Sequence, residues 1–428
     1  MTITQPDLGT HRDLSVFETL ESEVRGYCRS WPTVFTRALG SRMYDEGGRE
    51  YLDFFAGAGS LNYGHNNPVL KRALLDYLQQ DGVTHGLDMS TTAKRTFLET
   101  FRDVLLRPRG LPYKVMFTGP TGTNAVEAAL KLARKVKGRE SIVSFTNAFH
   151  GMSLGSLAVT GNAFKRAGAG VPLVHTTPIP FDGYLGGGEP DFSWFERMLA
   201  DKGSGLNQPA AVIVETVQGE GGINVARAEW LCRLSDVCKR QDMLLIVDDI
   251  QMGCGRTGAF FSFEEAGIVP DIVTVSKSIS GYGLPMALCL FKPELDVWEP
   301  GEHNGTFRGN NPAFVTAAAA LDAYWTDGEL KKQTLARGEK VEWALRAIAV
   351  EHAQEVADLR GRGLVWGLEF HDKGRADRVA RRAFELGLLI ETSGPESEVV
   401  KLLPALTITP DELDEGLRIL SRAVRETS

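Results

Sequence analysis

The middle of the chain alternates short apolar runs with amphipathic stretches. Each run has four or five residues and is apolar on both faces, and helical patterns separate the runs. Strands of this kind are typical of a mostly parallel sheet that is covered by helices on each side. The predicted strands span residues 114–117, 141–145, 210–214, 244–247, 272–275 and 287–291, and a helix is predicted over 124–135.

The two ends of the chain carry different patterns. Residues 35–54 alternate apolar and polar positions around a turn at 46–48, as a β-hairpin does. After residue 326 the chain is rich in helix, and it then returns to short strands over 364–370 and 399–403. We therefore predict an α/β fold with a large domain and a small α+β domain made from both termini. The predicted bounds are 1–60 for the N-terminal segment of the small domain, 61–325 for the large domain and 326–428 for the C-terminal part.

Composition narrows the class of protein. The 428 residues are 43% hydrophobic and 24% charged, which is enough for one large core and a smaller one. A net charge of -8 argues against a nucleic-acid partner, because phosphate binding favours a basic face. The five cysteines form no CxxC pair, so neither a disulfide framework nor a zinc site is expected.

Targeting signals are not apparent in the sequence. Residues 1–7 lack the basic start and apolar core of a signal peptide. No apolar stretch is long enough to span a bilayer, so we expect no membrane partner. A soluble, cytoplasmic protein is the default expectation.

Lys277 and Asp248 are the strongest candidates for chemistry. Each directly follows a predicted core strand, and ligands of open α/β sheets bind at the carboxyl ends of the strands. Pyridoxal 5'-phosphate (PLP) needs a lysine for its Schiff base and an acid beside its pyridinium nitrogen. Most lysines are solvated surface residues, but a lysine directly after a buried strand is not typical of them.

The segment after Asp248 supports this interpretation. An ionised Asp248 would keep the ring nitrogen protonated and make the ring an electron sink. Gln251 is placed to reach the ring oxygen, and Lys277, once free, could act as a base. A glycine-rich surface loop over 249–258 is the alternative, but a buried acid without a partner would be costly.

Other motifs are less specific. Gly122 and Thr123 lie between a predicted strand and a helix, where backbone N–H groups attract a phosphate, although an ordinary capped turn looks similar. Phe149 could stack on a pyridine ring or be a core aromatic. Glu220 lies in a glycine-rich turn that could equally be a solvated loop, and Thr306 could donate to a phosphate or belong to a plain turn.

Taken together, the order and spacing of these motifs closely resemble the class III (ω-amino-acid) aminotransferases, of the type I PLP fold. The resemblance runs from Trp31-Pro32 to Leu402-Leu403-Pro404 and covers nearly the whole chain. It implies PLP as the cofactor, small-molecule substrates and no metal. The implied roles are Schiff-base lysine for Lys277, pyridinium partner for Asp248, ring-hydroxyl contact for Gln251, stacking aromatic for Phe149, and phosphate loop for Gly122 and Thr123.

The resemblance also implies a homodimer and a way to handle two substrates. Thr306 matches a threonine that reaches the phosphate from the other subunit. Glu220 and Arg360 match the family's switching pair, so we hypothesise that Glu220 covers Arg360 for an ω-substrate and moves away for glutamate. A fixed structural salt bridge is the alternative.

Within the family, four segments resemble members that act on L-glutamate and L-aspartate 4-semialdehyde. The implied products are L-2,4-diaminobutyrate, which feeds ectoine synthesis, and 2-oxoglutarate. Aminotransfer from ornithine, acetylornithine or 4-aminobutyrate is the nearest alternative, followed by a PLP aminomutase or racemase and by a non-catalytic PLP-binding protein. The four segments are residues 119–127, 149–155, 276–286 and 303–310.

Overall fold

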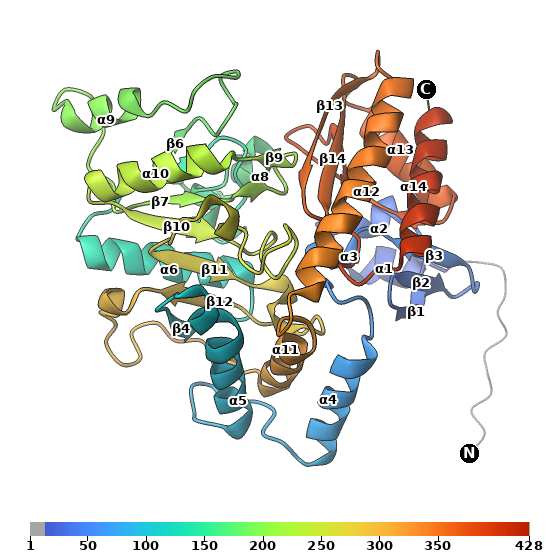
Figure 1. Cartoon of the computed structure of the whole chain (residues 1–428), viewed down its shortest axis with the longest axis horizontal. Coiled ribbons are helices and arrows are strands. Elements are labelled where there is room, and N and C mark those ends of the chain that lie inside the picture. Colours follow the sequence, from blue (N-terminus) through green and yellow to red (C-terminus); the bar gives the residue numbers. More distant parts are fainter. Residues whose placement is uncertain (1–12, 428) are drawn as a thin grey trace.

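A seven-stranded sheet forms the centre of the larger part of the molecule (Figure 1). The computed structural model describes residues 13–427, so the predicted lack of a signal peptide at residues 1–7 lies outside the described residues. The strand order is β4-β12-β11-β10-β7-β5-β6; β12 runs antiparallel to its neighbours, and the pairs from β11 to β6 are parallel. The strands are β4 (Lys114–Phe117), β5 (Ile142–Phe145), β6 (Thr176–Ile179), β7 (Ala211–Val214), β10 (Leu244–Asp248), β11 (Ile272–Val275) and β12 (Leu288–Phe291).

All the core strands predicted from the apolar runs are confirmed, and one strand of this seven-stranded sheet was missed. The missed strand is β6, which lies at the edge of the sheet and contains Pro178 and two threonines. Its two threonines are partly buried, Pro178 is exposed and Ile179 is buried. An edge strand tolerates proline and polar residues because one side of it has no neighbour, so it lacks the apolar run of a central strand.

Helices cover both faces of this sheet. Side chains along β10 alternate between the two faces of the sheet. Ile246 packs in the apolar cluster that includes helix α6 (Gly122–Lys137), whereas Leu245 and Val247 pack in the cluster that includes helix α10 (Ala228–Arg240). Figure 1 shows α6 and α10 on opposite sides of the strands. Because both faces are buried, the carboxyl ends of the strands are the place where the sheet can present side chains to a ligand.

The smaller part joins the two ends of the chain. Strand β3 pairs with β2 on one side and, in parallel, with β15 from the C-terminal region on the other. The predicted hairpin is therefore three strands, with a first turn at Gly40 and a second at 46–49. The strands are β1 (Phe35–Leu39), β2 (Arg42–Asp45), β3 (Glu50–Asp53) and β15 (Leu388–Leu389). The domain bounds at 60/61 and 325/326 stay predictions.

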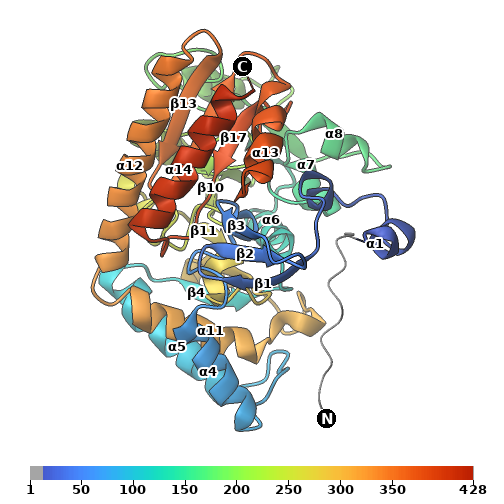
Figure 2. The same ribbon diagram turned by 90° about the vertical axis from the view of Figure 1, so that its right-hand side faces the viewer.

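A second four-stranded sheet completes the smaller part, with the order β13-β14-β17-β16. Three C-terminal helices pack on it and beside it (Figure 2). Strands β16 and β17 of this sheet lie near the carboxyl ends of the strands of the large sheet. The elements are β13 (Val356–Arg362), β14 (Val365–Phe370), β16 (Glu391–Ser393), β17 (Val399–Leu402), α12 (Glu329–Glu351), α13 (Arg375–Glu385) and α14 (Pro410–Arg425).

The remaining elements connect these layers. Helix α11 packs against α4 and α5 at the lower end of Figure 1, and β8 and β9 form a small hairpin. Among residues 13–427, no helix combines the length and the apolar character that crossing a membrane requires. The bounds are α1 (Ser15–Leu20), α2 (Tyr27–Ser30), α3 (Ala56–Gly59), α4 (Pro68–Gln79), α5 (Thr92–Thr100), α7 (Leu154–Ala158), α8 (Ala163–Ala167), β8 (Val217–Gln218), β9 (Asn224–Val225), α9 (Ser193–Ala200) and α11 (Asn311–Tyr324).

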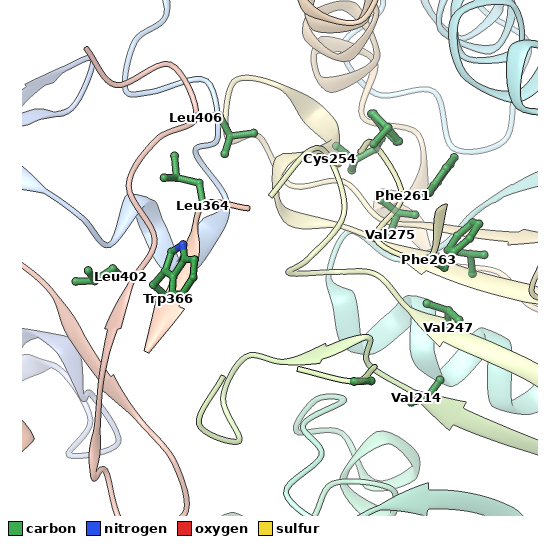
Figure 3. Packing of buried hydrophobic residues seen from close by; sticks show 14 of the residues in the cluster. Val214, Val247, Cys254, Phe261, Phe263, Val275, Leu364, Trp366, Leu402 and Leu406 are labelled. Carbon is green, nitrogen blue, oxygen red and sulfur yellow. The ribbon is translucent and has the colours of Figure 1, made fainter. Parts of the chain in front are cut away.

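One apolar cluster crosses from the large sheet to the smaller part. Figure 3 shows Leu364, Trp366 and Leu402 on one side and Val247 and Val275, at the ends of β10 and β11, on the other. Burying such side chains from both parts stabilises their mutual placement, because apolar area removed from water contributes roughly 25 cal/mol per Å². The carboxyl ends of β10 and β11, where the candidate site residues lie, are thus packed against the smaller part.

Candidate active site

The predicted cofactor residues gather around one cavity of about 190 Å³ at the carboxyl ends of the central strands. They come from segments that are far apart in the sequence, and the parallel strands bring them together. Thr306 and Arg360 are the predicted site residues that do not line this cavity. The predicted residues that line it are Gly122, Thr123, Phe149, Glu220, Asp248, Gln251 and Lys277.

Lys277 follows β11 and opens a 3-10 turn, Lys277–Ser280. Its backbone has φ +53°, a left-handed conformation that is uncommon for a residue with a long side chain and is concentrated at functional sites. Its Nζ donates a hydrogen bond of 2.8 Å to the carbonyl oxygen of Ala58. Burial lowers the pKa of Lys277 to about 8, so part of the amine is neutral and nucleophilic near neutral pH.

Asp248 ends the neighbouring strand β10, and three groups of the protein contact its carboxylate. Its Oδ1 accepts hydrogen bonds from the Thr274 hydroxyl at 3.1 Å and from the Ile250 backbone at 3.2 Å. Its Oδ2 lies 2.7 Å from Nδ1 of His150. Burial alone would lower the pKa of His150, but the carboxylate of Asp248 outweighs it and raises that pKa. The His150 imidazole is thereby held against the Asp248 carboxylate.

His150 is a site residue that the sequence reasoning missed. It follows Phe149 directly and lines the cavity. Its Nε2 is buried and has no hydrogen-bond partner among residues 13–427. His150 could have been found from its position in the sequence, because it lies beyond the end of the predicted strand 141–145 and next to the candidate Phe149.

Gln251 and Phe149 lie on two sides of the cavity. The Gln251 Nε2 donates to Ala58 O at 3.1 Å and to Glu220 Oε1 at 3.4 Å. Its Oε1 is buried and makes no hydrogen bond within the described part of the chain, so an acceptor is available for a ligand hydroxyl. The backbone N–H of Phe149 donates to Glu215 at 2.9 Å, which fixes the loop that presents its ring.

The N-terminus of helix α6 opens into the cavity. Gly122 begins the helix, and the Thr123 hydroxyl contacts the hydroxyls of Ser153 and Ser156 at 2.6 and 2.5 Å. A Cβ on Gly151 would lie 2.5 Å from the Thr123 hydroxyl, so glycine is needed for this close approach. Free N–H groups and the helix dipole make this end suitable for a phosphate.

Thr306 is exposed on a 3-10 turn, Thr306–Arg308, away from the cavity wall. The side chain of the next residue, Phe307, is 66% exposed and stacks on His85. The role of Thr306 at a phosphate would require a second subunit, and it stays a prediction.

Glu220 and Arg360 do not pair as predicted. The Glu220 Oε1 lies 2.7 Å from Nζ of Lys401, on β17. The Arg360 guanidinium contacts Glu369 and Asp358, and its Nε donates to Gly222 O at 2.9 Å. No ion pair between Glu220 and Arg360 is found among residues 13–427. The pairing differs because Arg360 lies on β13, where the neighbouring strand supplies Glu369, whereas β17 faces Glu220. Arg360 as a substrate-binding residue stays a prediction.

Lys401 was also missed by the sequence reasoning. It is fully buried and lies between Glu220 and a second carboxylate, Glu391, whose Oε1 is 2.8 Å from its Nζ. The signal in the sequence was a single charge inside the apolar run 399–403. Such a charge is stable in a core only when partners surround it, so it indicates a cluster even before the partners are known.

Comparison with known proteins agrees with this geometry. Residues 27–424 match the family Aminotransferase class-III. The chain belongs to the class-III aminotransferases. It is 81% identical to the diaminobutyrate–2-oxoglutarate transaminase of Streptomyces avermitilis, over the full length of both chains. It is 57% identical to the enzyme of the same name from Halomonas elongata, covering 96% of this chain and 98% of that one.

Solved structures of other aminotransferases share the fold. The ornithine aminotransferase of Toxoplasma gondii has a TM-score of 0.83 at 25% identity, covering 96% of this chain and 94% of that one. The lysine aminotransferase of M. tuberculosis has a TM-score of 0.84 at 25% identity, with 97% and 99% covered. The predicted α/β, type I fold is therefore confirmed.

The residues of the cavity fit pyridoxal 5'-phosphate, the cofactor of this aminotransferase family. Lys277 would bond to its aldehyde, Asp248 would hold its ring N–H, and the unpartnered Gln251 oxygen would accept from its ring hydroxyl. The α6 N-terminus with Thr123 would hold its phosphate. When bound, the cofactor supplies an electron-withdrawing ring that stabilises the negative charge left by C–H cleavage.

Proposed function

We propose that this protein transfers the amino group of L-glutamate to the aldehyde of L-aspartate 4-semialdehyde. The products are L-2,4-diaminobutyrate and 2-oxoglutarate. The observation that carries the proposal is the cavity with Lys277, Asp248 and Gln251 in a chain that is 81% identical to a diaminobutyrate–2-oxoglutarate transaminase. We further propose that the reaction is the first committed step of ectoine synthesis and takes place in the cytoplasm.

The side chains of the cavity have different roles in the proposed reaction. The Lys277 amine, with its pKa lowered to about 8, can take the proton from the reacting carbon of the substrate and return it. Asp248, held by His150, would be the group that contacts the ring nitrogen of the bound cofactor. Glu220 lines the cavity, so its carboxylate can interact with a charged group of the substrate.

A coupled assay tests the reaction. Purified protein with PLP, L-glutamate and L-aspartate 4-semialdehyde should give diaminobutyrate and 2-oxoglutarate in equal amounts. The Lys277→Ala variant should lose at least about 100-fold in rate, since general acid–base catalysis alone contributes roughly 10²- to 10⁴-fold. If the wild-type protein makes neither product but does consume ornithine or 4-aminobutyrate, the aminotransferase class stands and the substrate assignment fails.

We also propose that the enzyme is a homodimer with a shared site, in which Thr306 of the partner subunit binds the phosphate. Its exposure on a surface turn next to the exposed Phe307 supports this arrangement. Mixing the inactive variants Lys277→Ala and Thr306→Ala should restore activity above the sum of the two, because hybrid dimers contain one intact site. A mixture that stays additive would contradict the shared site.

A further inference from the structure

The carbonyl oxygen of Ala58 holds the amine of Lys277 beside the cavity. It accepts a hydrogen bond of 2.8 Å from Nζ of Lys277 and a second, of 3.1 Å, from Nε2 of Gln251. Both donating residues line the cavity, and Ala58 itself is only partly buried. A carbonyl oxygen has two lone pairs, so these two donors use its full capacity. The protein therefore already binds an amino group at this oxygen.

The backbone around Ala58 has an unusual conformation that its surroundings hold in place. All four residues of the turn 56–59 have left-handed φ angles, between +45° and +80°. Such angles are costly for alanine and persist only where neighbouring groups fix the chain. Asp53 accepts from the N–H groups at the start of the turn, at 2.8 and 2.9 Å. Ser60 and Ser278 donate to the carbonyls before and after that of Ala58, at 2.8 and 2.9 Å.

The amine of Lys277 must leave the Ala58 oxygen during the proposed reaction. It has to bond to the cofactor or face the reacting carbon of the substrate. One lone pair of the oxygen is then free, while Gln251 keeps the other. A buried carbonyl that loses a partner costs free energy, so an ammonium of the substrate that takes the place of Nζ is stabilised there.

The substrates of the proposed reaction differ in whether they bring a second ammonium into the cavity. L-2,4-Diaminobutyrate carries one on the carbon beside its carboxylate, in addition to the amine that reacts. L-Glutamate has no second ammonium. 4-Aminobutyrate has none either, although its carbon chain, carboxylate and reacting amine are those of diaminobutyrate. A charge that is buried without a partner is costly, so the second ammonium needs an acceptor of its own.

The carboxylates that line the cavity are already engaged. Three groups of the protein contact Asp248. Glu215 accepts from two backbone N–H groups, at 2.9 and 3.2 Å, and Oε1 of Glu220 lies 2.7 Å from Nζ of Lys401. The Ala58 oxygen differs from these groups because the reaction itself removes its partner.

We infer that the carbonyl of Ala58 binds the second ammonium of L-2,4-diaminobutyrate, and the corresponding ammonium of L-aspartate 4-semialdehyde. The turn 56–59 directs this carbonyl, and Gln251 occupies its other lone pair. The site thereby distinguishes diaminobutyrate from 4-aminobutyrate, and glutamate does not depend on this contact. This inference deepens the proposed function and rests on it.

Single half-reactions, followed by the absorbance of the bound cofactor, test the inference. In the unmodified enzyme, kcat/KM for diaminobutyrate should exceed that for 4-aminobutyrate by about 10- to 100-fold, the value of a hydrogen bond to a charged group. Replacing Gly59 by glycolic acid converts the amide after Ala58 into an ester, whose carbonyl is a weaker acceptor. The ratio of the two donors should then fall by about three- to tenfold. Both donors need Lys277 equally, so any disturbance of Lys277 cancels in the ratio.

Replacing Ser60 by glyceric acid is the matched control. It weakens the carbonyl of Gly59, which accepts from Ser278 instead of from a ligand. Each replacement also removes one backbone N–H that donates at 3.2 Å, from Gly59 to Phe55 in the test and from Ser60 to Gly57 in the control. The control should leave the donor ratio unchanged. An equal fall in both proteins would mean that the turn, and not the acceptor, causes the change, and would overturn the inference.

Two side-chain variants of Ala58 give a second test. A β-branched residue is strongly disfavoured at a φ of +55°, so Ala58→Val should shift the carbonyl and lower the donor ratio. Ala58→Gly tolerates this φ and should keep most of the ratio. Thermal unfolding and bound cofactor check folding, and the ester pair decides if Ala58→Val does not fold. Loss of the ratio in Glu220→Gln, with a normal ratio in the Gly59 ester, would assign the ammonium to Glu220 and overturn the inference.

Binding of two compounds that lack the reacting amine gives a readout without turnover. L-Homoserine and 4-hydroxybutyrate carry a hydroxyl in place of that amine and differ only in the second ammonium. Calorimetry on the loaded enzyme should show that L-homoserine binds at least about tenfold more tightly, and that the Gly59 ester reduces this difference. Equal binding of the two compounds to the unmodified enzyme would contradict the inference.

Failure of the inference and failure of the proposed function give different results. If the enzyme consumes diaminobutyrate and 4-aminobutyrate equally well, the proposed function stands and the role of Ala58 is wrong. If the enzyme consumes no diaminobutyrate, the proposed substrate is wrong. Binding of L-homoserine and 4-hydroxybutyrate still reports on the Ala58 carbonyl in that case.

Discussion

At one end of the cavity, Lys277 and Asp248 follow two neighbouring parallel strands of the same sheet. At the other end, Glu220 comes from a hairpin turn of the large part and lines the cavity. Its partner Lys401, and Glu391 beside Lys401, come from two strands of a different sheet and do not line the cavity. We call these the cofactor end and the substrate end. Groups that must act on every substrate lie on rigid neighbouring elements, whereas groups that distinguish substrates lie where two parts of the molecule meet.

The two ends also differ in how their charges are balanced. At the cofactor end, Asp248 has fixed donors in Thr274, Ile250 and His150. At the substrate end, Glu220 lies in the turn between β8 and β9 and shares its cation with Glu391. Variants at the cofactor end should therefore affect both half-reactions equally, and variants at the substrate end should affect them unequally.

Asp248→Asn should give the largest equal effect. Replacing the carboxylate removes the charge that contacts the His150 imidazole and that would hold the ring nitrogen of the cofactor. A charge-assisted hydrogen bond of this kind corresponds to about 100-fold. We expect kcat/KM for glutamate and for diaminobutyrate to fall by about this factor together, as measured in single half-reactions.

Asp271→Asn is the matched control for this change. Asp271 accepts from the Leu245 backbone at 2.8 Å and pairs with Lys292, at the amino end of the same two strands. It should leave both half-reactions within about threefold while changing stability slightly, since most single substitutions act within a few kcal/mol. A strongly donor-selective effect of Asp248→Asn would break the comparison between the two ends.

The cofactor end could be predicted from the sequence because its signals are local. A strand that is buried on both faces is a short apolar run, and the residue after it lies at the ligand edge of the sheet. Lys277 and Asp248 each satisfy this rule, and pairing of β10 with β11 brings them together. The residues around them were then placed by the order and spacing of the family motifs.

The substrate end could not be predicted in the same way. Glu220 and Lys401 are 181 residues apart, and no local pattern indicates which of several basic residues faces which acid. The family resemblance suggested Arg360, but β13 pairs with β14 so that Arg360 lies opposite Gly367, and its guanidinium forms an ion pair with the nearby Glu369 instead. His150 and Asp248, 98 residues apart, were missed as a pair for the same reason.

Gly219→Ala should give an intermediate effect, at the boundary between the two ends. A Cβ on Gly219 would lie 1.6 Å from Oε1 of Gln251, so Gln251 must move away from the ring hydroxyl that it is proposed to bind. Losing one hydrogen bond of about 1 kcal/mol, together with the steric shift, should weaken PLP binding by about tenfold in a fluorescence titration. Gly188→Ala, where a Cβ would meet nothing within 4 Å, is the control and should bind PLP normally.

The smallest effect is expected in the pH dependence that links the two ends. Burial lowers the pKa of Lys277 to about 8, the negative charge of Glu220 opposes this shift, and the positive charge of Lys401 adds to it. The amine must be neutral to bond covalently to added PLP, so the rate of this step in cofactor-free protein should rise with pH through about 8.

Two variants should move this midpoint in opposite directions. Glu220→Gln removes an anion that stabilises the ammonium, which lowers the pKa of Lys277, so the midpoint should move to lower pH. Lys401→Met removes a cation that destabilises the ammonium, which raises this pKa, so the midpoint should move to higher pH. Glu369→Gln, which alters only the partner of Arg360, should leave the midpoint in place. Stopped-flow absorbance over a pH series measures all three. Shifts of the same sign in the first two variants would mean that they act by disturbing the fold, because electrostatic coupling requires opposite signs for opposite charges.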